Sequence, residues 1–155
     1  MGSREDLVAQ LAAHMTAEGL KQTGQRAAIL DAFLDCAGHV SLDELLVRVL
    51  ERRPGVGYAT VYRTMKVFVA AGIAHERQFG DGQTRFEVAD LDNDHHDHLI
   101  CTICGHIFEF EDDEIERRQA EVAADRGLRI TSHRMNLWGE CQSPTTCQWR
   151  TEKAG

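Results

Sequence analysis

Apolar residues recur every three or four positions through the first half of the chain, and this spacing predicts a series of amphipathic helices. The predicted helices cover residues 4–17, 25–36, a stretch that begins at Ser41 and ends before Pro54, and 59–71. Ser41 and Glu44 have the spacing of a capping box, in which each side chain serves the other residue's backbone amide. The third-helix residues expected to face the core are Leu42, Leu45, Leu46, Val49 and Leu50.

A β-hairpin is predicted next, because residues 73–79 and 84–88 flank a short Gly-rich turn at 80–83. Helices followed by a β-hairpin form the element order of a winged helix-turn-helix. In that fold the last helix enters the DNA major groove and the hairpin is the wing.

The second half predicts strands at 96–101, 107–111 and 128–137, and a helix at 112–126 that ends at Gly127. A unit of about 45 residues is short for a self-sufficient core, so we expect metal binding or dimerisation to stabilise it.

The predicted fold class is therefore α+β. A winged helix-turn-helix occupies residues 1–88, an acidic linker covers 89–94, and a small α/β domain with a C-terminal tail covers 95–155.

The distribution of charged residues along the chain agrees with this division into two domains. The net charge of −8 falls as −1 on residues 1–84 and −7 on residues 85–155, which also hold five of the eight histidines and four of the five cysteines. No apolar run approaches the roughly 18 residues that cross a bilayer, and no secretory signal is evident. We expect a cytoplasmic protein with no membrane partner, in which closely spaced cysteines favour metal ligation over disulfides.

Four consecutive residues, His95, His96, Asp97 and His98, are the strongest chemical signal. Successive side chains of a strand point to opposite faces, so His96 and His98 should share one face while His95 and Asp97 share the other. Imidazole and carboxylate ligands suit Fe(II), Mn(II), Co(II), Ni(II) or Zn(II), and the chemistry alone does not choose among them. The plainer alternative is a polar strand end with solvated histidines.

The cysteines offer another metal site. Cys101 and Cys104, followed by Gly105, have the spacing of a zinc knuckle. Cys141 and Cys147 would complete a tetrahedral set, which would be structural because four thiolates leave no open position. The alternative is that one or both pairs are free thiols or a disulfide. Cys36 lies on a predicted helix between apolar residues and is expected to act as a small hydrophobe.

The predicted fourth helix carries candidate DNA contacts near its start. Tyr62 could pack on a thymine methyl, and Arg63 is the type of residue that most often contacts guanine. Lys21 could reach a minor groove or a phosphate, and Arg26 could bind a phosphate near a helix start. The alternative for these residues is a solvated helix face.

Five segments together resemble the ferric uptake regulator family of metal-dependent bacterial repressors. They are GLKQTGQR at 19–26, HVSLDEL at 39–45, ATVYRTM at 59–65, HHDHLICTICG at 95–105 and RITSH at 129–133. The resemblance spans most of the chain. It implies a homodimer with an N-terminal winged helix, a C-terminal α/β dimerisation domain and a regulatory metal between the two.

The resemblance also implies three ligand sets. The regulatory set is His39, Glu87, His96 and His98. The second set is His95, Asp97, Glu116 and His133. The structural zinc set is Cys101, Cys104, Cys141 and Cys147, in which the last pair is more widely spaced than is usual in the family. Lys21, Tyr62 and Arg63 match the family's DNA-contacting positions.

The resemblance further implies a repressor that binds double-stranded operator DNA and controls iron homeostasis in response to Fe(II). Zinc-responsive members usually place a cysteine in the regulatory site, and peroxide sensors favour aspartate where Glu87 stands, so iron fits best, with manganese response or peroxide sensing as alternatives. A small metallohydrolase is the rival from another class, but the chain has no HExxH-type motif, and we expect no enzyme activity. A zinc-stabilised interaction module would leave His39 and Glu87 without a role.

Overall fold

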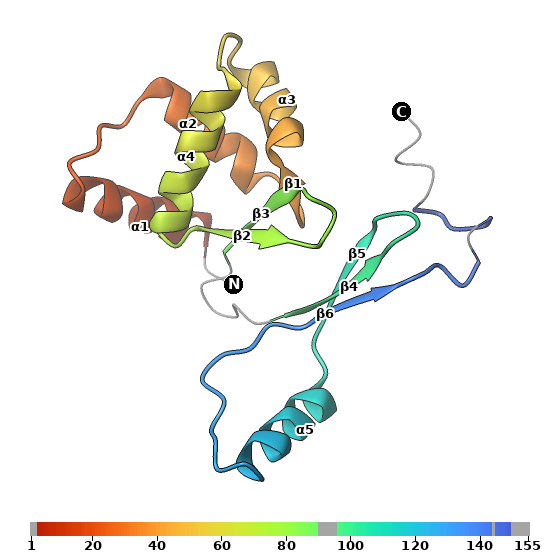
Figure 1. The fold of residues 1–155 in the computed structure, drawn as a ribbon. Coiled ribbons are helices and arrows are strands. Elements are labelled where there is room, and N and C mark those ends of the chain that lie inside the picture. The colour runs from red at the N-terminus through yellow and green to blue at the C-terminus, as the bar shows by residue number, and fades with distance from the viewer. Residues whose placement is uncertain (1–2, 90–95, 144, 150–155) are drawn as a thin grey trace. The chain divides into compact units, whose positions relative to one another are not determined.

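The structure is a computed structural model that describes residues 3–89, 96–143 and 145–149. It contains two compact units, Met1–Asp94 and His95–Gly155 (Figure 1). No helix within the described ranges is long and apolar enough to cross a membrane.

The first unit contains four helices and three short strands. They are α1 (Arg4–Ala17), α2 (Gly24–Leu34), β1 (Val40–Ser41), α3 (Leu42–Arg52), α4 (Tyr58–Ala70), β2 (Ala74–Gln78) and β3 (Thr84–Val88). Side-chain caps start three of the helices, and the capping box expected from Ser41 and Glu44 is present at α3. The predicted helices and hairpin are therefore confirmed, with ends shifted by one or two residues.

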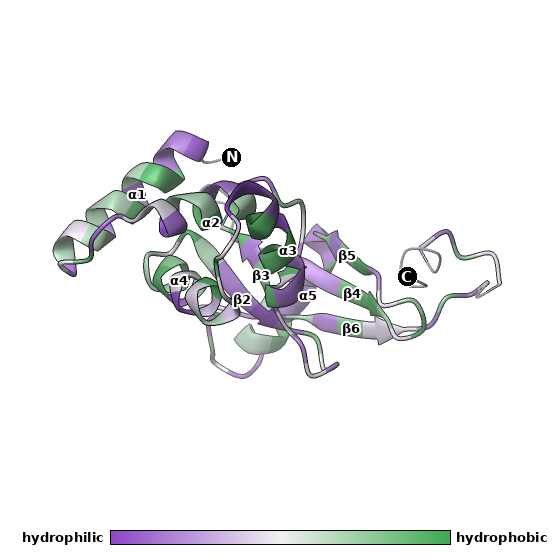
Figure 2. Ribbon diagram, turned by 90° about the horizontal axis from the view of Figure 1, so that it is seen from above, coloured by the Kyte–Doolittle hydropathy of each residue, from purple (hydrophilic) through white to green (hydrophobic). Residues whose placement is uncertain are grey.

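One hydrophobic core serves this unit. Its largest fully buried side chains include Phe33 of α2, Phe68 of α4 and Phe86 of β3. The helices supply most of the core, whereas β2 is largely hydrophilic, as its colour in Figure 2 shows. Leu50 was expected to face inward but is 39% exposed, because the inward face of α3 follows Leu42, Leu45 and Val49 and leaves Leu50 at its margin.

The strands of the first unit form an antiparallel sheet in the order β1-β3-β2. β1 is a two-residue strand that sequence periodicity did not predict. It pairs Val40 with Phe86, and this antiparallel register brings His39, which precedes Val40, beside Glu87, which follows Phe86. On the other side of β3, His75 of β2 lies directly opposite Glu87.

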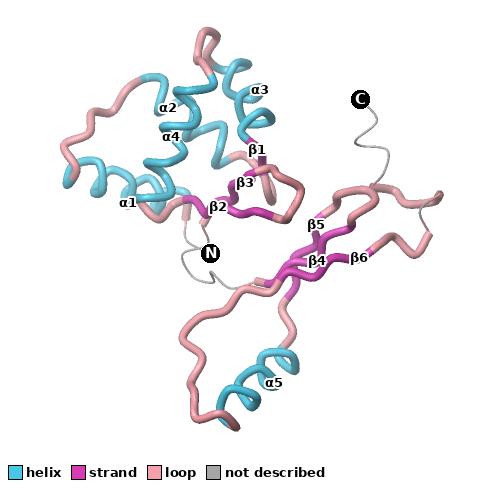
Figure 3. The backbone as a smooth tube through the Cα atoms, viewed as in Figure 1, coloured by secondary structure: helices cyan, strands magenta, loops and turns pink. Residues whose placement is uncertain are grey.

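The second unit contains β4 (Asp97–Cys101), β5 (Ile107–Phe110), α5 (Asp113–Ala124) and β6 (Asn136–Gly139). The sheet order is β5-β4-β6, in which β4 pairs antiparallel with β5 and parallel with β6. Residues 128–135 form a loop rather than the first part of the predicted strand 128–137 (Figure 3). The prediction was wrong there because the parallel pairing on β4 begins only at His98 with Asn136. Among the described residues β4 therefore offers Leu128 no pairing partner, and Leu128 is 67% exposed.

The second unit buries little apolar surface of its own. Among its described residues only Ile100, Cys101 and Cys104 are buried hydrophobic side chains, and α5 buries none. Large exposed apolar side chains are Leu99, Ile103, Phe108, Val122, Leu128, Ile130, Leu137 and Trp138. This unit therefore requires stabilisation from outside its own core.

Candidate metal centres and DNA-contacting residues

A buried histidine–carboxylate pair lies on the sheet of the first unit. His39 Nε2 lies 2.6 Å from Glu87 Oε2, and both side chains are about 5% exposed. Arg77 of β2 donates from Nε to the other oxygen, Glu87 Oε1, at 2.7 Å. Burial by itself would raise the pKa of Glu87, but the hydrogen bonds and charges of His39 and Arg77 more than offset it and lower that pKa to about 2.

The position of His39 is fixed by an aromatic neighbour. The His39 and Phe79 rings meet edge to face with centroids 5.0 Å apart. The pair thus presents an ionised carboxylate and an imidazole at fixed positions on one unit. Such a pair supplies two of the ligands that a first-row divalent metal prefers.

A second group of donors lies at the start of β4 in the other unit. The rings of His96 and His98 have centroids 5.0 Å apart, as expected for side chains at i and i+2 on one strand face. His96 Nε2 lies 3.7 Å from Glu109 Oε1 of β5. Glu109 was missed by the sequence analysis. Its place follows from the strand register, which sets it opposite His98.

Asp97 faces away from that pair into a separate cluster. Donor atoms of Asp97, Glu116 and His133 lie within 4.8 Å of one another, and His133 Nε2 is 3.1 Å from Glu116 Oε1 and 3.6 Å from Asp97 Oδ1. Asp97 is almost fully buried, and a carboxylate in such a place requires a hydrogen-bonding or cationic partner. His95, the remaining residue predicted for this set, lies outside the described residues.

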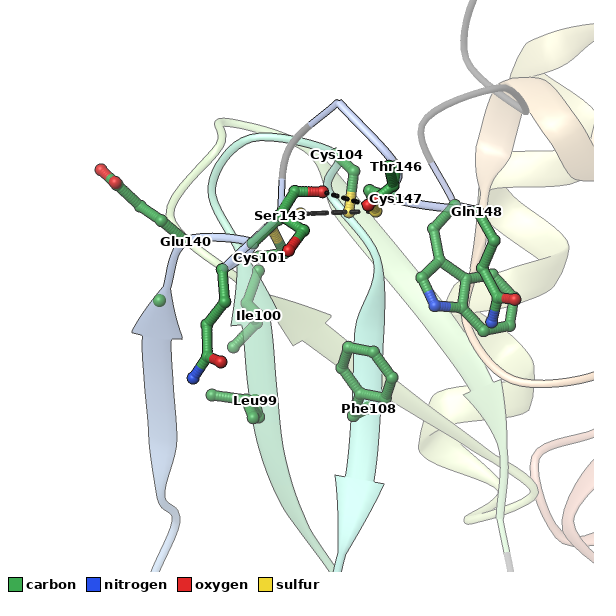
Figure 4. A pocket seen from close by; sticks show the side chains of 14 residues that line it. Leu99, Ile100, Cys101, Cys104, Phe108, Glu140, Ser143, Thr146, Cys147 and Gln148 are labelled. Carbon is green, nitrogen blue, oxygen red and sulfur yellow. Dashed lines mark hydrogen bonds between the residues drawn. The ribbon is translucent and has the colours of Figure 1, made fainter.

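Cys101, Cys104 and Cys147 gather at one end of the second unit's sheet (Figure 4). The sulfurs of Cys101, Cys104 and Cys141 lie within 4.8 Å of one another, and Cys147 contacts this group through Cys141. Cys141 Sγ lies 3.0 Å from Cys101 Sγ, 3.7 Å from Cys104 Sγ and 3.4 Å from Cys147 Sγ. Zinc–sulfur bonds of about 2.3 Å place the sulfurs of a tetrahedral site about 3.8 Å apart, so this cluster fits zinc after a small expansion. Cys36 is half-buried against the core of the first unit, in keeping with its expected role as a small hydrophobe.

The contacts within the thiol cluster make Cys101 the cysteine that loses its proton most readily. Hydrogen bonds from the backbone of Cys104 and the side chain of Cys141 lower the pKa of Cys101 to about 6. The same contact with Cys101, together with Cys147, raises the pKa of Cys141. The thiolate is the form of cysteine that binds zinc.

Three of the four residues predicted to contact DNA are exposed. Tyr62 and Arg63 lie on the outer face of α4, and Lys21 lies in the loop before α2. Arg26 is partly buried and donates a hydrogen bond from Nη1 to the carbonyl oxygen of Lys21, so it also orders that loop. Lys66, one helical turn after Tyr62, is a further exposed cation on α4 that the sequence analysis did not single out.

A winged helix-turn-helix joined to a small α/β unit with three clusters of metal-binding side chains defines a metal-binding, DNA-binding regulator class. Comparison with known proteins identifies it. Residues 17–138 match the ferric uptake regulator family, and the chain belongs to that family. Members of the family are transcriptional regulators rather than enzymes, and they are dimeric DNA-binding proteins.

Individual relatives agree over most of the chain. A ferric uptake regulation protein of Bordetella parapertussis is 45% identical over 124 residues, covering 79% of this chain and 88% of that protein. The Helicobacter pylori regulator, described with three functional metal-binding sites, gives a TM-score of 0.84 at 26% identity, over 94% of this chain and 96% of that one. A Francisella tularensis regulator solved with iron gives 0.72 at 31% identity, over 81% and 95%. The predicted fold class and family are confirmed.

Proposed function

We propose that this regulator represses iron-uptake genes by binding operator DNA when Fe(II) is bound, with Mn(II) as the nearest alternative metal. The observation that carries the proposal is the buried His39–Glu87 pair, because an imidazole and an ionised carboxylate held 2.6 Å apart would supply half of the ligands of a divalent-metal site. The iron-bound Francisella relative supports iron as the metal.

The regulatory metal would be bound by His39 and Glu87 from the first unit and by His96 and His98 from the second. This ligand set comes from the family resemblance, and each unit's own geometry agrees with its half. Ligands from two units on one ion would select one arrangement of the units, and DNA bound to that arrangement would tighten metal binding by the same factor. A typical coupling of about 1–3 kcal/mol corresponds to roughly 5–150-fold in DNA affinity.

The other two clusters would hold the second unit together. Asp97, Glu116 and His133, with His95, would bind a second divalent metal. Cys101, Cys104, Cys141 and Cys147 would bind structural zinc, which has no role in sensing. Homodimerisation would cover the apolar surface that includes Leu99 and Phe108, which line a cavity of about 400 Å³ beside the cysteines.

DNA contacts would come from the exposed residues of the first unit. Tyr62 and Arg63 would reach base edges from α4, and Lys21 would reach the minor groove or a phosphate. Arg26 would contribute a phosphate contact or hold the loop that presents Lys21. A protein that acts on bacterial operators in this way works in the cytoplasm.

The test is fluorescence anisotropy with operator-length DNA, using Mn(II) or anaerobic Fe(II) and then a chelator. We expect DNA affinity to rise with metal and to fall again with the chelator. His96→Ala should abolish the metal response, whereas His106→Ala, which removes a histidine of the same unit that stacks on Trp149, should retain it. Full metal stimulation in the His96→Ala variant would contradict the proposed ligand set.

A further inference from the structure

Each oxygen of Glu87 has a nitrogen partner from the first unit. His39 Nε2 lies 2.6 Å from Oε2, while Arg77 Nε and a terminal Arg77 nitrogen both lie 2.7 Å from Oε1. Two donors of one guanidinium therefore converge on a single carboxylate oxygen. This arrangement leaves Oε2, on the His39 side, as the oxygen that can bind a metal together with the imidazole.

Arg77 is held where water screens its charge poorly. Its side chain is 16% exposed and Glu87 is 5% exposed. An arginine side chain stays protonated at any physiological pH, so this positive charge is permanent. A divalent ion that binds Glu87 must approach a fixed cation that already uses the same carboxylate.

Another arginine on the same sheet face is placed differently. Arg85 of β3 makes a two-point contact with Asp81, with Nη1–Oδ1 at 3.0 Å and Nη2–Oδ2 at 2.6 Å. The charge of Arg85 is thus matched by its own carboxylate. Arg77 is matched by Glu87, the residue proposed above as a metal ligand.

We infer that Arg77 is an affinity-setting residue of the regulatory centre: a built-in cation that holds Glu87 in the metal-free protein and competes with the divalent metal for it. Arg77 thereby weakens metal binding and confines Glu87 to binding through one oxygen. This inference rests on the proposed function, because it takes Glu87 to be a regulatory ligand.

The consequence is a higher threshold for the sensor. A site that bound every available divalent ion would remain occupied, whereas a site opposed by an internal cation responds only when the metal is abundant. Removal of the charge should therefore tighten metal binding. Removal of a merely structural contact would loosen it, so the sign of the effect distinguishes the two roles.

The experiment measures Mn(II) binding to the full chain in its native oligomeric state, without DNA, by titration calorimetry and by the EPR signal of unbound Mn(II). Arg77→Gln and Arg77→Met both remove the charge, and Met retains the apolar stem that packs on the sheet. We expect each to lower the Kd of the regulatory site at least tenfold. Arg77→Lys, which retains the charge, should stay within about threefold of the parent, given the lower preorganisation of lysine.

Arg85→Gln is the matched control, because it removes the same charge from the same sheet face but from a pair that does not include Glu87. It should leave the Kd unchanged within about twofold, because the Arg85 charge is neutralised by the half-exposed Asp81 rather than by Glu87. Equal tightening by Arg85→Gln and Arg77→Gln would assign the effect to general charge and overturn the inference. An unchanged or weaker Kd in the Arg77→Gln and Arg77→Met variants would also overturn it.

Thermal unfolding supplies a second readout if one variant folds poorly. In chelator, Arg77→Met should unfold at a lower temperature than the parent, and saturating Mn(II) should raise its Tm by more than it raises that of the parent. An equal or smaller Mn(II)-induced rise would count against the inference. Glu87→Gln tests the regulatory site independently of the role of Arg77. Retention of every Mn(II) equivalent by that variant would refute the proposed site itself.

Discussion

The ammonium group of Lys66 on α4 forms an ion pair with Glu76 on β2. The same group lies over the ring of Tyr62, 5.4 Å from its centroid. One lysine thus joins the helix that carries the proposed base contacts to the first strand of the wing. While Glu76 holds it, its charge is neutralised beside a residue proposed to contact DNA.

We predict that Glu76→Gln will strengthen DNA binding. Without its carboxylate partner, Lys66 becomes available to a phosphate, and one additional phosphate contact should steepen the dependence of log K on log salt by about 0.9. The measurement is anisotropy at several salt concentrations with saturating metal. Glu51→Gln, which removes an exposed charge from α3, is the control for net charge. Identical salt slopes for Glu76→Gln and the parent would contradict the prediction.

Helix α5 carries one glutamate inside the second metal cluster and another outside it, and the two allow a matched comparison of variants. Glu116 of α5 lies 3.1 Å from His133, whereas the Glu114 side chain is 86% exposed and points to solvent. We predict that Glu116→Gln will lose about one equivalent of divalent metal per chain and lower the Tm of the metal-loaded protein, because a ligand is lost. Elemental analysis and calorimetry would measure this. Glu114→Gln should behave as the parent, and equal losses in both variants would argue against the site.

Zinc should control the folding of the second unit. Cys104→Ser removes one of the converging thiols, and we predict loss of about one zinc per chain together with loss of cooperative unfolding in residues 96–149, because structural zinc contributes about 10–16 kcal/mol to small domains. Hydrogen exchange would locate the effect. Residues 3–89, with their own core, should remain protected. Cys36→Ser should retain the zinc, and retention of zinc by Cys104→Ser would refute the assignment.

Stability of the metal-free protein should depend on pH through Glu87. Its pKa falls from an ordinary 4.5 to about 2 on folding, so its ionisation stabilises the fold fully above about pH 5, and this contribution is lost as pH falls toward 2. The difference corresponds to about 3 kcal/mol. Urea unfolding in chelator should therefore show Glu87→Gln less stable than the parent at pH 7, with a gap that narrows between pH 5 and pH 3. A gap independent of pH would exclude this linkage.

Local patterns were sufficient to predict the parts of the structure that depend on neighbours in sequence. The Ser41–Glu44 capping box appears as expected because its two partners are three residues apart. The separation of His96 and His98 from Asp97 likewise follows from strand alternation alone. These features require no knowledge of how distant segments pack.

The two residues that sequence patterns did not place near the proposed ligands lie there because of strand register. Arg77 and Glu109 come near the histidine and carboxylate ligands only because β2 pairs with β3, and β4 with β5, at one particular offset. A shift of one residue would turn each of these side chains to the opposite face. Leu128 illustrates the reverse case, since its apolar pattern predicted a strand although β4 offers it no pairing partner.

The parallel pairing of β4 with β6 has a consequence for protein synthesis. β5 follows β4 closely and can pair with it at once, whereas β6 and Cys141 follow only after α5 and the loop 128–135. At about 5–20 residues per second, a ribosome needs roughly 2–8 s to move from Cys101 to Cys141. During that interval Cys101 and Cys104 are present without their later partners. The second unit therefore cannot complete its thiol cluster until Cys141 and Cys147 have been synthesised, so its maturation follows that of the winged helix.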